Sequence, residues 1–370
     1  WGGATLHHLL SRVPQGSHFE TAQTDADETA AILFTSGSTG VPKGAVYSHG
    51  NFSAQVELLR KVYDIRPGEI DLPTFPLFAL FAPALGMTSV VPEMDFSRPA
   101  AVDPAKIIAA IETFQVTTMF GSPALIDRVG RYGAAEGIKL PSLKRAISAG
   151  APVPAPVLER FAGMLQNGAQ VFTPYGATEA LPVCSIGSAE ILDETRYATD
   201  RGRGVCVGRP IPGVELEIIR IADEAIAKWS DDLKIADGEI GEIVVKGPQV
   251  TRSYFNRDAS TALAKITDPQ NGGFWHRMGD LGYRDAQGRI WFCGRKGHRV
   301  VTAAETLFTI PSEAVFNTHP EVLRTALVGV GAPGRQRAVL CVELETGVDT
   351  AAVERINREL LAIGAECELT

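Results

Sequence analysis

The residues best suited to chemistry form a run of hydroxyl side chains, glycines and one lysine over residues 35–44. An apolar segment, residues 32–34, leads into this run, and Pro42-Lys43-Gly44 closes it. Glycines let backbone N–H groups face one point, where hydroxyl groups add further donors to an anion. We therefore predict a loop that holds the terminal phosphates of a nucleotide. Its members are Thr35, Ser36, Gly37, Ser38, Thr39, Gly40 and Lys43.

Two other structures could contain such a run. The P-loop of kinases and NTPases is excluded because Lys43 follows a proline, and Gly44 stands where a Mg²⁺-binding Ser or Thr is required. A flexible Ser/Gly linker is the second alternative. A linker needs neither an incoming strand nor the apolar residues 45–47 that follow, so the phosphate loop is the better interpretation.

A second group lies in the middle of the chain, Tyr175-Gly176-Ala177-Thr178-Glu179. A tyrosine can stack on adenine, a threonine hydroxyl can hold an α-phosphate, and a carboxylate can bind Mg²⁺. Taken alone, these five residues are also consistent with any turn at a strand end. A third group pairs Asp280, in a glycine-rich turn, with Arg295 fifteen residues later; an aspartate there is often only a turn former.

Residues 35–44 resemble the phosphate-loop signature of the AMP-forming adenylate synthetases, a superfamily that contains acyl-CoA synthetases, peptide-synthetase adenylation domains and luciferases. Residues 175–179 are similar to its adenine and magnesium motif. Residues 278–282 and 294–296 are similar to its ribose-binding motifs. Gly150-Ala151-Pro152 resembles the backbone strip along the other face of the adenine.

The resemblance implies that ATP and Mg²⁺ are bound and that a carboxylate attacks the α-phosphorus to give an acyl-AMP and pyrophosphate. The loop with Lys43 would hold the β- and γ-phosphates. Thr178 and Glu179 would hold the α-phosphate and the metal, and Asp280 with Arg295 would bind the ribose. It also implies an αβ region before the phosphate loop and a C-terminal lysine, and neither is found in this sequence.

Several departures from the acyl-CoA synthetases resemble the branch found in bacterial olefin biosynthesis. Ala79 replaces the histidine of a Pro-Leu-Phe-His motif, Gly297 stands at the hinge position, and residues 300–307 contain no glycine. In that branch the β-hydroxyl of a long-chain 2-alkyl-3-hydroxy acid attacks its own activated carbonyl, which gives a β-lactone. The alternatives are a fatty-acyl-CoA synthetase and an inactive acyl- or nucleotide-binding protein. The expected acyl pocket includes Phe78, Ala79 and Phe81.

The composition of the chain argues against several classes of protein. The 370 residues are 45% hydrophobic and carry a net charge of −8, which argues against a nucleic-acid partner. The five cysteines are scattered, so we expect a reduced cytoplasm without a structural metal. Residues 72–92 carry no charge but contain four prolines, which favours an apolar pocket wall or core over a transmembrane helix. An apolar product makes a complex with other pathway enzymes a reasonable expectation.

Periodicity predicts an α/β fold. A helix is expected at 103–115, and strand–glycine–helix units recur after residues 116–120, 143–147 and 171–174, which indicates a parallel sheet with its ligand at the strand ends. Alternating segments from about 205 predict antiparallel strands. We expect a large domain over 1–294, with an antiparallel β subdomain at 205–294, and a small, incomplete α+β domain over 295–370 that moves on a hinge.

Overall fold

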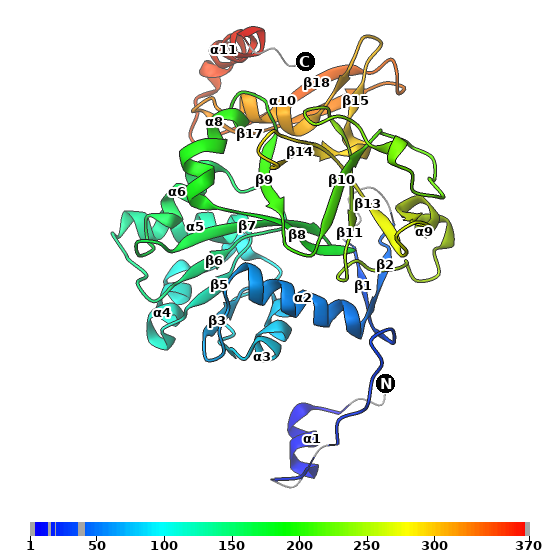
Figure 1. Cartoon of the computed structure of the whole chain (residues 1–370). Coiled ribbons are helices and arrows are strands. Elements are labelled where there is room, and N and C mark those ends of the chain that lie inside the picture. The colour runs from blue at the N-terminus through cyan, green and yellow to red at the C-terminus, as the bar shows by residue number, and fades with distance from the viewer. Residues whose placement is uncertain (1–3, 14–15, 19, 36–40, 367–370) are drawn as a thin grey trace.

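The computed structural model describes residues 4–13, 16–18, 20–35 and 41–366. Its centre is a 12-stranded sheet with the strand order β10-β11-β13-β14-β9-β8-β7-β6-β5-β3-β4, and β12 lies beside β13. Helices cover both faces of one half of this sheet (Figure 1). The α/β class predicted from the sequence is confirmed.

The strands of this half are parallel from β4 to β7. Helices α4, α5 and α6 pack against one face, where their leucine, isoleucine and phenylalanine side chains cover buried strand residues such as Met119 and Val171. Local sequence sets where the helices begin: Asp103 and Ser122 each accept a backbone N–H of the first turn, and a proline follows each of them. The elements are β3 Ile70–Pro73, β4 Thr88–Ser89, α4 Pro104–Phe114, β5 Thr118–Phe120, α5 Pro123–Ala135, β6 Arg145–Ile147, α6 Ala155–Ala162 and β7 Gln170–Ala177.

The opposite face carries helix α2, His49–Val62, and the proline-rich segment. Ser48 caps α2 in a capping box with Asn51, so His49 is the first helical residue. Residues 72–92 form no continuous helix; they divide into η1, Pro76–Leu80, and α3, Phe81–Leu85, followed by β4. Nowhere in the described ranges does a helix combine the length and apolarity that a membrane crossing requires.

The other half of the sheet is antiparallel, and it begins earlier than the sequence suggested. The expected helix after residues 171–179 is wrong: Tyr175 and Gly176 lie within β7, Thr178 and Glu179 form a turn, and β8 follows. Val183 and Ile186 of β8 are buried, and this strand bonds to β7 on one side and β9 on the other. The strands are β8 Ala180–Gly187, β9 Val205–Pro210, β10 Glu215–Ile219, β11 Gly241–Lys246, β12 Lys265–Thr267, β13 Phe274–Arg284 and β14 Ile290–Arg295.

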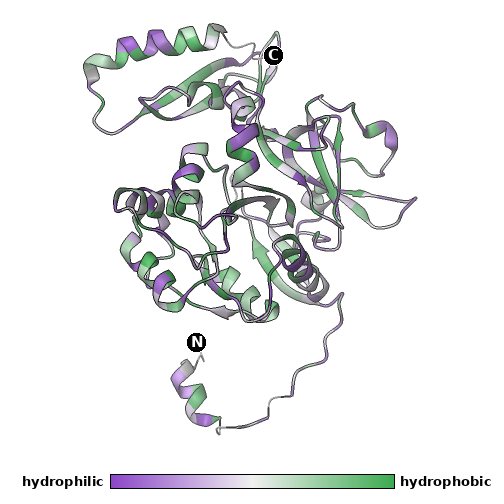
Figure 2. Cartoon of the chain, turned by 60° about the vertical axis from the view of Figure 1, so that its left-hand side comes forward, coloured by the Kyte–Doolittle hydropathy of each residue, from purple (hydrophilic) through white to green (hydrophobic). Residues whose placement is uncertain are grey.

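The sheet ends at Arg295, and the remaining elements lie together at one end of the molecule, opposite the N-terminal helix α1, Leu6–Arg12 (Figures 1 and 2). Val322 of β17 packs with Ile356 and Leu360 of α11. These elements are η5 Lys296–His298, β15 Val300–Val301, β16 Thr306–Leu307, α10 Thr309–Phe316, β17 Val322–Val330, β18 Arg337–Leu344, η6 Thr350–Ala352 and α11 Val353–Glu366. The division of the chain into two domains stays a prediction.

The remaining short elements connect these strands and helices. They are η2 Pro99–Ala101, α7 Ser188–Glu190, η3 Ile191–Thr195, α8 Arg196–Thr199, η4 Asp231–Leu233 and α9 Asp258–Ala264. A separate hairpin, β1 Thr29–Phe34 with β2 Gly44–Ser48, lies beside the large sheet and carries the expected phosphate loop between its strands.

Candidate active site

The neck of the expected phosphate loop is formed by Thr35 and Lys43 at the open end of the β1–β2 hairpin. The N–H of Thr35 donates to the Lys43 carbonyl at 2.9 Å, and the Lys43 N–H donates to the Thr35 hydroxyl at 3.2 Å. This double contact fixes where the loop leaves and re-enters the hairpin. Ser36, Gly37, Ser38, Thr39 and Gly40 lie outside the described residues.

The hairpin and the Thr178–Glu179 turn lie against each other although more than 130 residues separate them. The buried Tyr47 hydroxyl of β2 donates to the Thr178 carbonyl. Gln55 donates to the same hydroxyl at 3.4 Å, and burial raises the pKa of Tyr47 to about 12, so its proton stays in this bond. Lys43 of the first motif and Thr178 and Glu179 of the second therefore line the same cavity.

Glu179 has a partner that no motif indicated. Tyr254 donates its hydroxyl hydrogen to Oε1 of Glu179, and the Lys43 ammonium lies 4.9 Å from the centre of the Tyr254 ring. Burial, followed by the nearby Glu179 charge, raises the pKa of Tyr254. Thr251 holds the Glu179 backbone carbonyl at 2.9 Å through its N–H. Oε2 of Glu179 makes no hydrogen bond to a described residue, so this oxygen is available as a hard ligand for a divalent cation.

Asp280 and Arg295 form an ion pair at 2.9 Å, as neighbours on β13 and β14. The Tyr175 hydroxyl donates to the other oxygen of Asp280 at 2.7 Å. Burial raises the pKa of Asp280 to about 6, although Arg295 and Tyr175 act in the opposite direction. Burial also raises the pKa of Tyr175 well above its ordinary value, so the tyrosine remains a donor. Arg295 and Tyr175 line the cavity, whereas Asp280 is not among the residues that line it.

One cavity of about 1010 Å³ is shared by most of the predicted site residues. Residues of the phosphate and adenine motifs line it, and so do the apolar side chains of Phe78 and Phe81. Gly150 has φ of +103° and open space around the position of a Cβ, so a ring could approach its backbone closely. Ala151, Pro152 and Ala79 are not among the lining residues. Those that line it are Thr35, Lys43, Phe78, Phe81, Gly150, Tyr175, Gly176, Thr178, Glu179 and Arg295.

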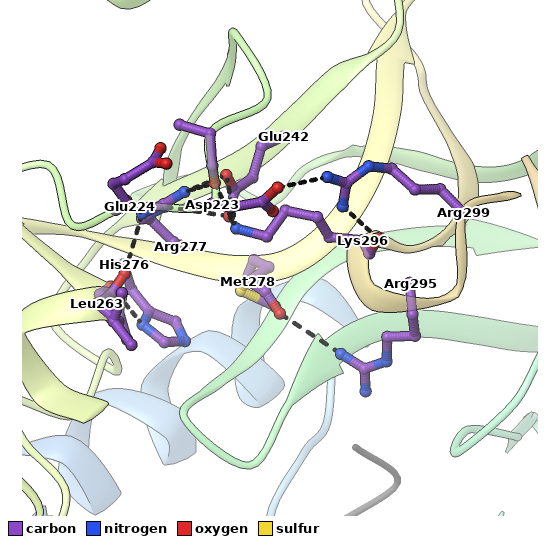
Figure 3. Close-up of polar contacts among 12 residues, drawn as sticks. Asp223, Glu224, Glu242, Leu263, His276, Arg277, Met278, Arg295, Lys296 and Arg299 are labelled. Atoms are coloured by element: carbon purple, nitrogen blue, oxygen red, sulfur yellow. Dashed lines mark hydrogen bonds and ion pairs between the residues drawn. The ribbon is translucent and has the colours of Figure 1, made fainter. Parts of the chain in front are cut away.

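A cluster of charged side chains holds the segment that follows β14, residues 296–299 (Figure 3). Glu242 of β11 accepts from Arg277 at 2.6 and 3.1 Å and from the Lys296 ammonium at 3.1 Å. Arg299 pairs with Asp223 at 2.7 Å and also donates to the Lys296 carbonyl (Figure 3). Lys296 is therefore anchored to the large sheet, and Gly297, the expected hinge, is the next residue.

Two more titratable side chains near Glu179 carried no sequence signal. Lys265 donates to the Thr251 carbonyl, and burial lowers its pKa to about 7. His276, its neighbour on β13, places Nδ1 3.2 Å from the Ala264 carbonyl, and burial lowers its pKa well below the ordinary value. Lys265, His276 and Tyr254 belong to no sequence motif. They can be recognised as neighbours of the site only from the tertiary structure.

The sequence profile of the AMP-binding enzyme family matches residues 5–255. Over 368 residues the chain is 53% identical to an olefin beta-lactone synthetase of Xanthomonas campestris pv. campestris, covering 99% of this chain and 65% of that protein. It is 31% identical to a 2-succinylbenzoate–CoA ligase of Geobacillus kaustophilus, over 91% of this chain and 64% of the ligase. The chain thus spans about two thirds of the length of these relatives.

Among solved structures, the O-succinylbenzoate coenzyme A synthetase of Bacillus subtilis, in complex with ATP and magnesium ion, has the same fold. The TM-score is 0.73 at 24% identity, and the match covers 95% of this chain and 67% of the synthetase. The family profile matches well over half of the chain, and its span contains the β1–β2 hairpin and the Thr178–Glu179 turn. The chain belongs to the AMP-binding enzyme family.

Proposed function

We propose that the whole protein activates a long-chain 2-alkyl-3-hydroxy acid with ATP and closes it to a β-lactone in olefin biosynthesis. The observation that carries this proposal is the 53% identity to an olefin beta-lactone synthetase over nearly the whole chain, against 31% for the CoA ligase. The apolar cavity wall with Phe78 and Phe81 supports an acid with alkyl chains. The absence of glycine from residues 300–307 agrees with a reaction that needs no thiol.

The proposed reaction has two steps. A carboxylate oxygen of the acid bonds to the α-phosphorus of ATP, and the bond to pyrophosphate breaks. The β-hydroxyl oxygen then bonds to the acyl carbon while the bond to AMP breaks, and the hydroxyl proton is released to solvent. The second step gains from the proximity of the internal nucleophile, which offsets part of the strain of a four-membered ring.

Each residue in the first step would act by position and charge. Lys43 and the loop after Thr35 would hold the β- and γ-phosphates, and Thr178 would hold the α-phosphate. Glu179, with Oε2 available, fits a Mg²⁺ ligand; when bound, Mg²⁺ neutralises part of the triphosphate charge. The Asp280–Arg295 pair would bind the ribose hydroxyls, and Tyr175 would lie on the adenine opposite Gly150.

The test uses the purified full-length protein with ATP, Mg²⁺ and a 2-alkyl-3-hydroxy acid, with and without CoA. We expect AMP, pyrophosphate and a β-lactone in both reactions, identified by mass spectrometry. AMP release that requires CoA and yields a thioester would favour the fatty-acyl-CoA synthetase instead. Failure of ATP–pyrophosphate exchange with every acid would favour an acyl- or nucleotide-binding protein.

The proposed chemistry also bears on the partners and the cellular location of the protein. An apolar substrate and an apolar product are poorly soluble in water, so direct transfer between this protein and neighbouring enzymes of the route is part of the proposal. The described cysteines 184, 206, 293 and 341 are all free thiols, which suits a cytoplasmic location. Co-purification of the full-length protein with enzymes that supply the hydroxy acid would support the complex.

A further inference from the structure

Asp71 differs from every other buried charged side chain in the described part of the chain. It lies in β3 with only 6% of its surface exposed, and its carboxylate makes no hydrogen bond or ion pair with any described residue. The other buried acids are all paired: Glu69 with Arg145, Glu242 with Arg277, Asp268 with Lys246 and Asp280 with Arg295. An unpaired buried carboxylate is costly, so it calls for an explanation.

The carboxyl group of Asp71 lines the same cavity as the predicted site residues. The cavity wall around it is apolar, with Tyr63, Ile65, Leu85 and Met87 among its members. The Tyr63 hydroxyl lies 3.1 Å from the Ser185 hydroxyl, and it makes no hydrogen bond to Asp71.

Neighbouring strands offer no donor either. Thr118 of β5 lies opposite Asp71, but its hydroxyl is bonded to Glu69 and Arg145. The Arg145 guanidinium is bound by Glu69, by Thr118 and by the Asp64 carbonyl, and Lys144 also faces Glu69, at 3.8 Å. The charged groups named on the neighbouring strands are therefore paired with one another, and none of them pairs with Asp71.

The sheet register places Asp71 deep in the cavity. Asp71 pairs with Thr118, which pairs with Arg145, two residues before β6 ends at Ile147. At about 3.3 Å per residue, this level lies about 7 Å below the end of the strand. Gly150 follows three residues after that end, at the mouth where the nucleotide is expected. An acyl chain that runs inward from the mouth therefore meets Asp71 at the far end.

We propose that Asp71 is a specificity-determining residue that limits how far an alkyl chain of the acid enters the deep end of the cavity. The inference rests on the proposed activation of an acid with alkyl chains. A methyl terminus that reaches the carboxyl displaces the last water from it and offers no hydrogen bond in return. Chains that end before Asp71 avoid this cost, so the residue selects acids by the position of their chain end.

The ionisation of Asp71 gives the selection a pH dependence. Burial raises the pKa of Asp71 to about 7, so the side chain changes charge near neutral pH. A neutral carboxylic acid tolerates an apolar neighbour far better than a carboxylate does. Long acids should therefore be selected against more strongly as the pH rises through about 7, whereas acids that stop short of Asp71 should be insensitive to it.

The experiment measures ATP–pyrophosphate exchange by the full-length protein with a homologous series of 3-hydroxy acids of increasing chain length. This readout reports acid activation whichever product forms afterwards. Asp71→Leu removes the polar group, and Asp71→Asn keeps its shape without its charge. In Asp71→Leu we expect the ratio of kcat/KM for the longest to the shortest active acids to rise about tenfold, the scale of a methylene-sized change in a pocket.

The pH profile separates selection from a merely structural role. We expect the long-to-short ratio of the unmodified protein to fall between pH 6 and pH 8, and the ratio of Asp71→Asn to stay flat. Unchanged ratios and pH profiles in both variants would overturn the inference while leaving the proposed function intact. If the unmodified protein activates no acid, both fail together. If Asp71→Leu does not fold, the pH profile of the long-to-short ratio in the isosteric Asp71→Asn variant tests the inference by itself.

Discussion

The acidic side chains at the two ends of the cavity differ in whether they are paired. At the end where we propose that ATP binds, called the nucleotide end below, Tyr254 donates to Glu179, and Arg295 and Tyr175 both contact Asp280. At the deep end, Asp71 has no partner among the described residues. Charges held in place can stabilise developing charge without reorganisation, which suits catalysis. An unpaired charge acts only by making certain neighbours unfavourable, which suits discrimination between substrates.

The comparison predicts that mutations at the nucleotide end affect the rate and mutations at the deep end affect selectivity. The four predictions below test it in order of decreasing effect. Each variant is made in the full-length protein.

Glu179→Gln should have the largest effect. The amide keeps the shape and can still accept the Tyr254 hydrogen, but the negative charge is lost. We expect kcat for ATP–pyrophosphate exchange to fall by about 10²–10³, the scale seen when one group that stabilises transition-state charge is removed. Glu239→Gln, on an exposed turn, is the matched control. A rate within twofold of that of the unmodified enzyme would contradict the proposed role of Glu179.

Lys43→Ala should lower kcat about a hundredfold, because the cation beside the Tyr254 ring is lost from the proposed triphosphate site. Initial rates of pyrophosphate release at saturating acid measure the change. Lys61→Ala, in the last turn of α2, removes the same charge at a distance from the cavity. Equal losses in the two variants would show that net charge, rather than the position of Lys43, matters.

Tyr175→Ala should raise the KM for ATP about tenfold with a smaller change in kcat, since a stacking surface and the bond to Asp280 are both removed. Tyr175→Phe keeps the ring and removes only the hydrogen bond, so its KM should rise about threefold. Steady-state kinetics with varied ATP separates the two. A larger loss in Tyr175→Phe than in Tyr175→Ala would contradict a stacking role.

Asp71→Asn should change stability slightly, with a dependence on pH that has a defined sign. Burial raises the pKa of Asp71 from 3.8 to about 7, so between these values the native protein holds a proton that the unfolded chain has released. The contribution to stability is complete below the lower value and is lost as the pH rises towards 7. The variant lacks this loss, so its melting temperature should exceed that of the unmodified protein by about 3 °C at pH 8.

At pH 5 the difference in melting temperature should be smaller, because the native aspartate is then neutral. Scanning calorimetry of both proteins at the two pH values measures it. A difference that grows towards acid pH would mean that the carboxylate is favoured in the native state, and Asp71 would then have a partner.

Much of the fold was open to sequence reasoning because its signals are local. The capped helices at Asp103 and Ser122 and the alternating strands of the antiparallel half are each encoded within a few neighbouring residues. The error at residues 171–179 has a physical cause. Whether a strand turns into a helix or a hairpin there depends on whether residues 180–187 find partners on both sides, and β9 lies over twenty residues further along.

The order and residue types of the motifs that line one end of the cavity were determined by the sequence alone. Only the tertiary structure decided which side chains support them: Tyr254 reaches Glu179 across 75 residues, and Tyr47 reaches Thr178 across 131. The isolation of Asp71 is likewise a tertiary property, since the burial of its side chain depends on the strands and helices packed around β3. Hydrogen-bond partners and desolvation depend on distances in space, and no local pattern of residues contains them.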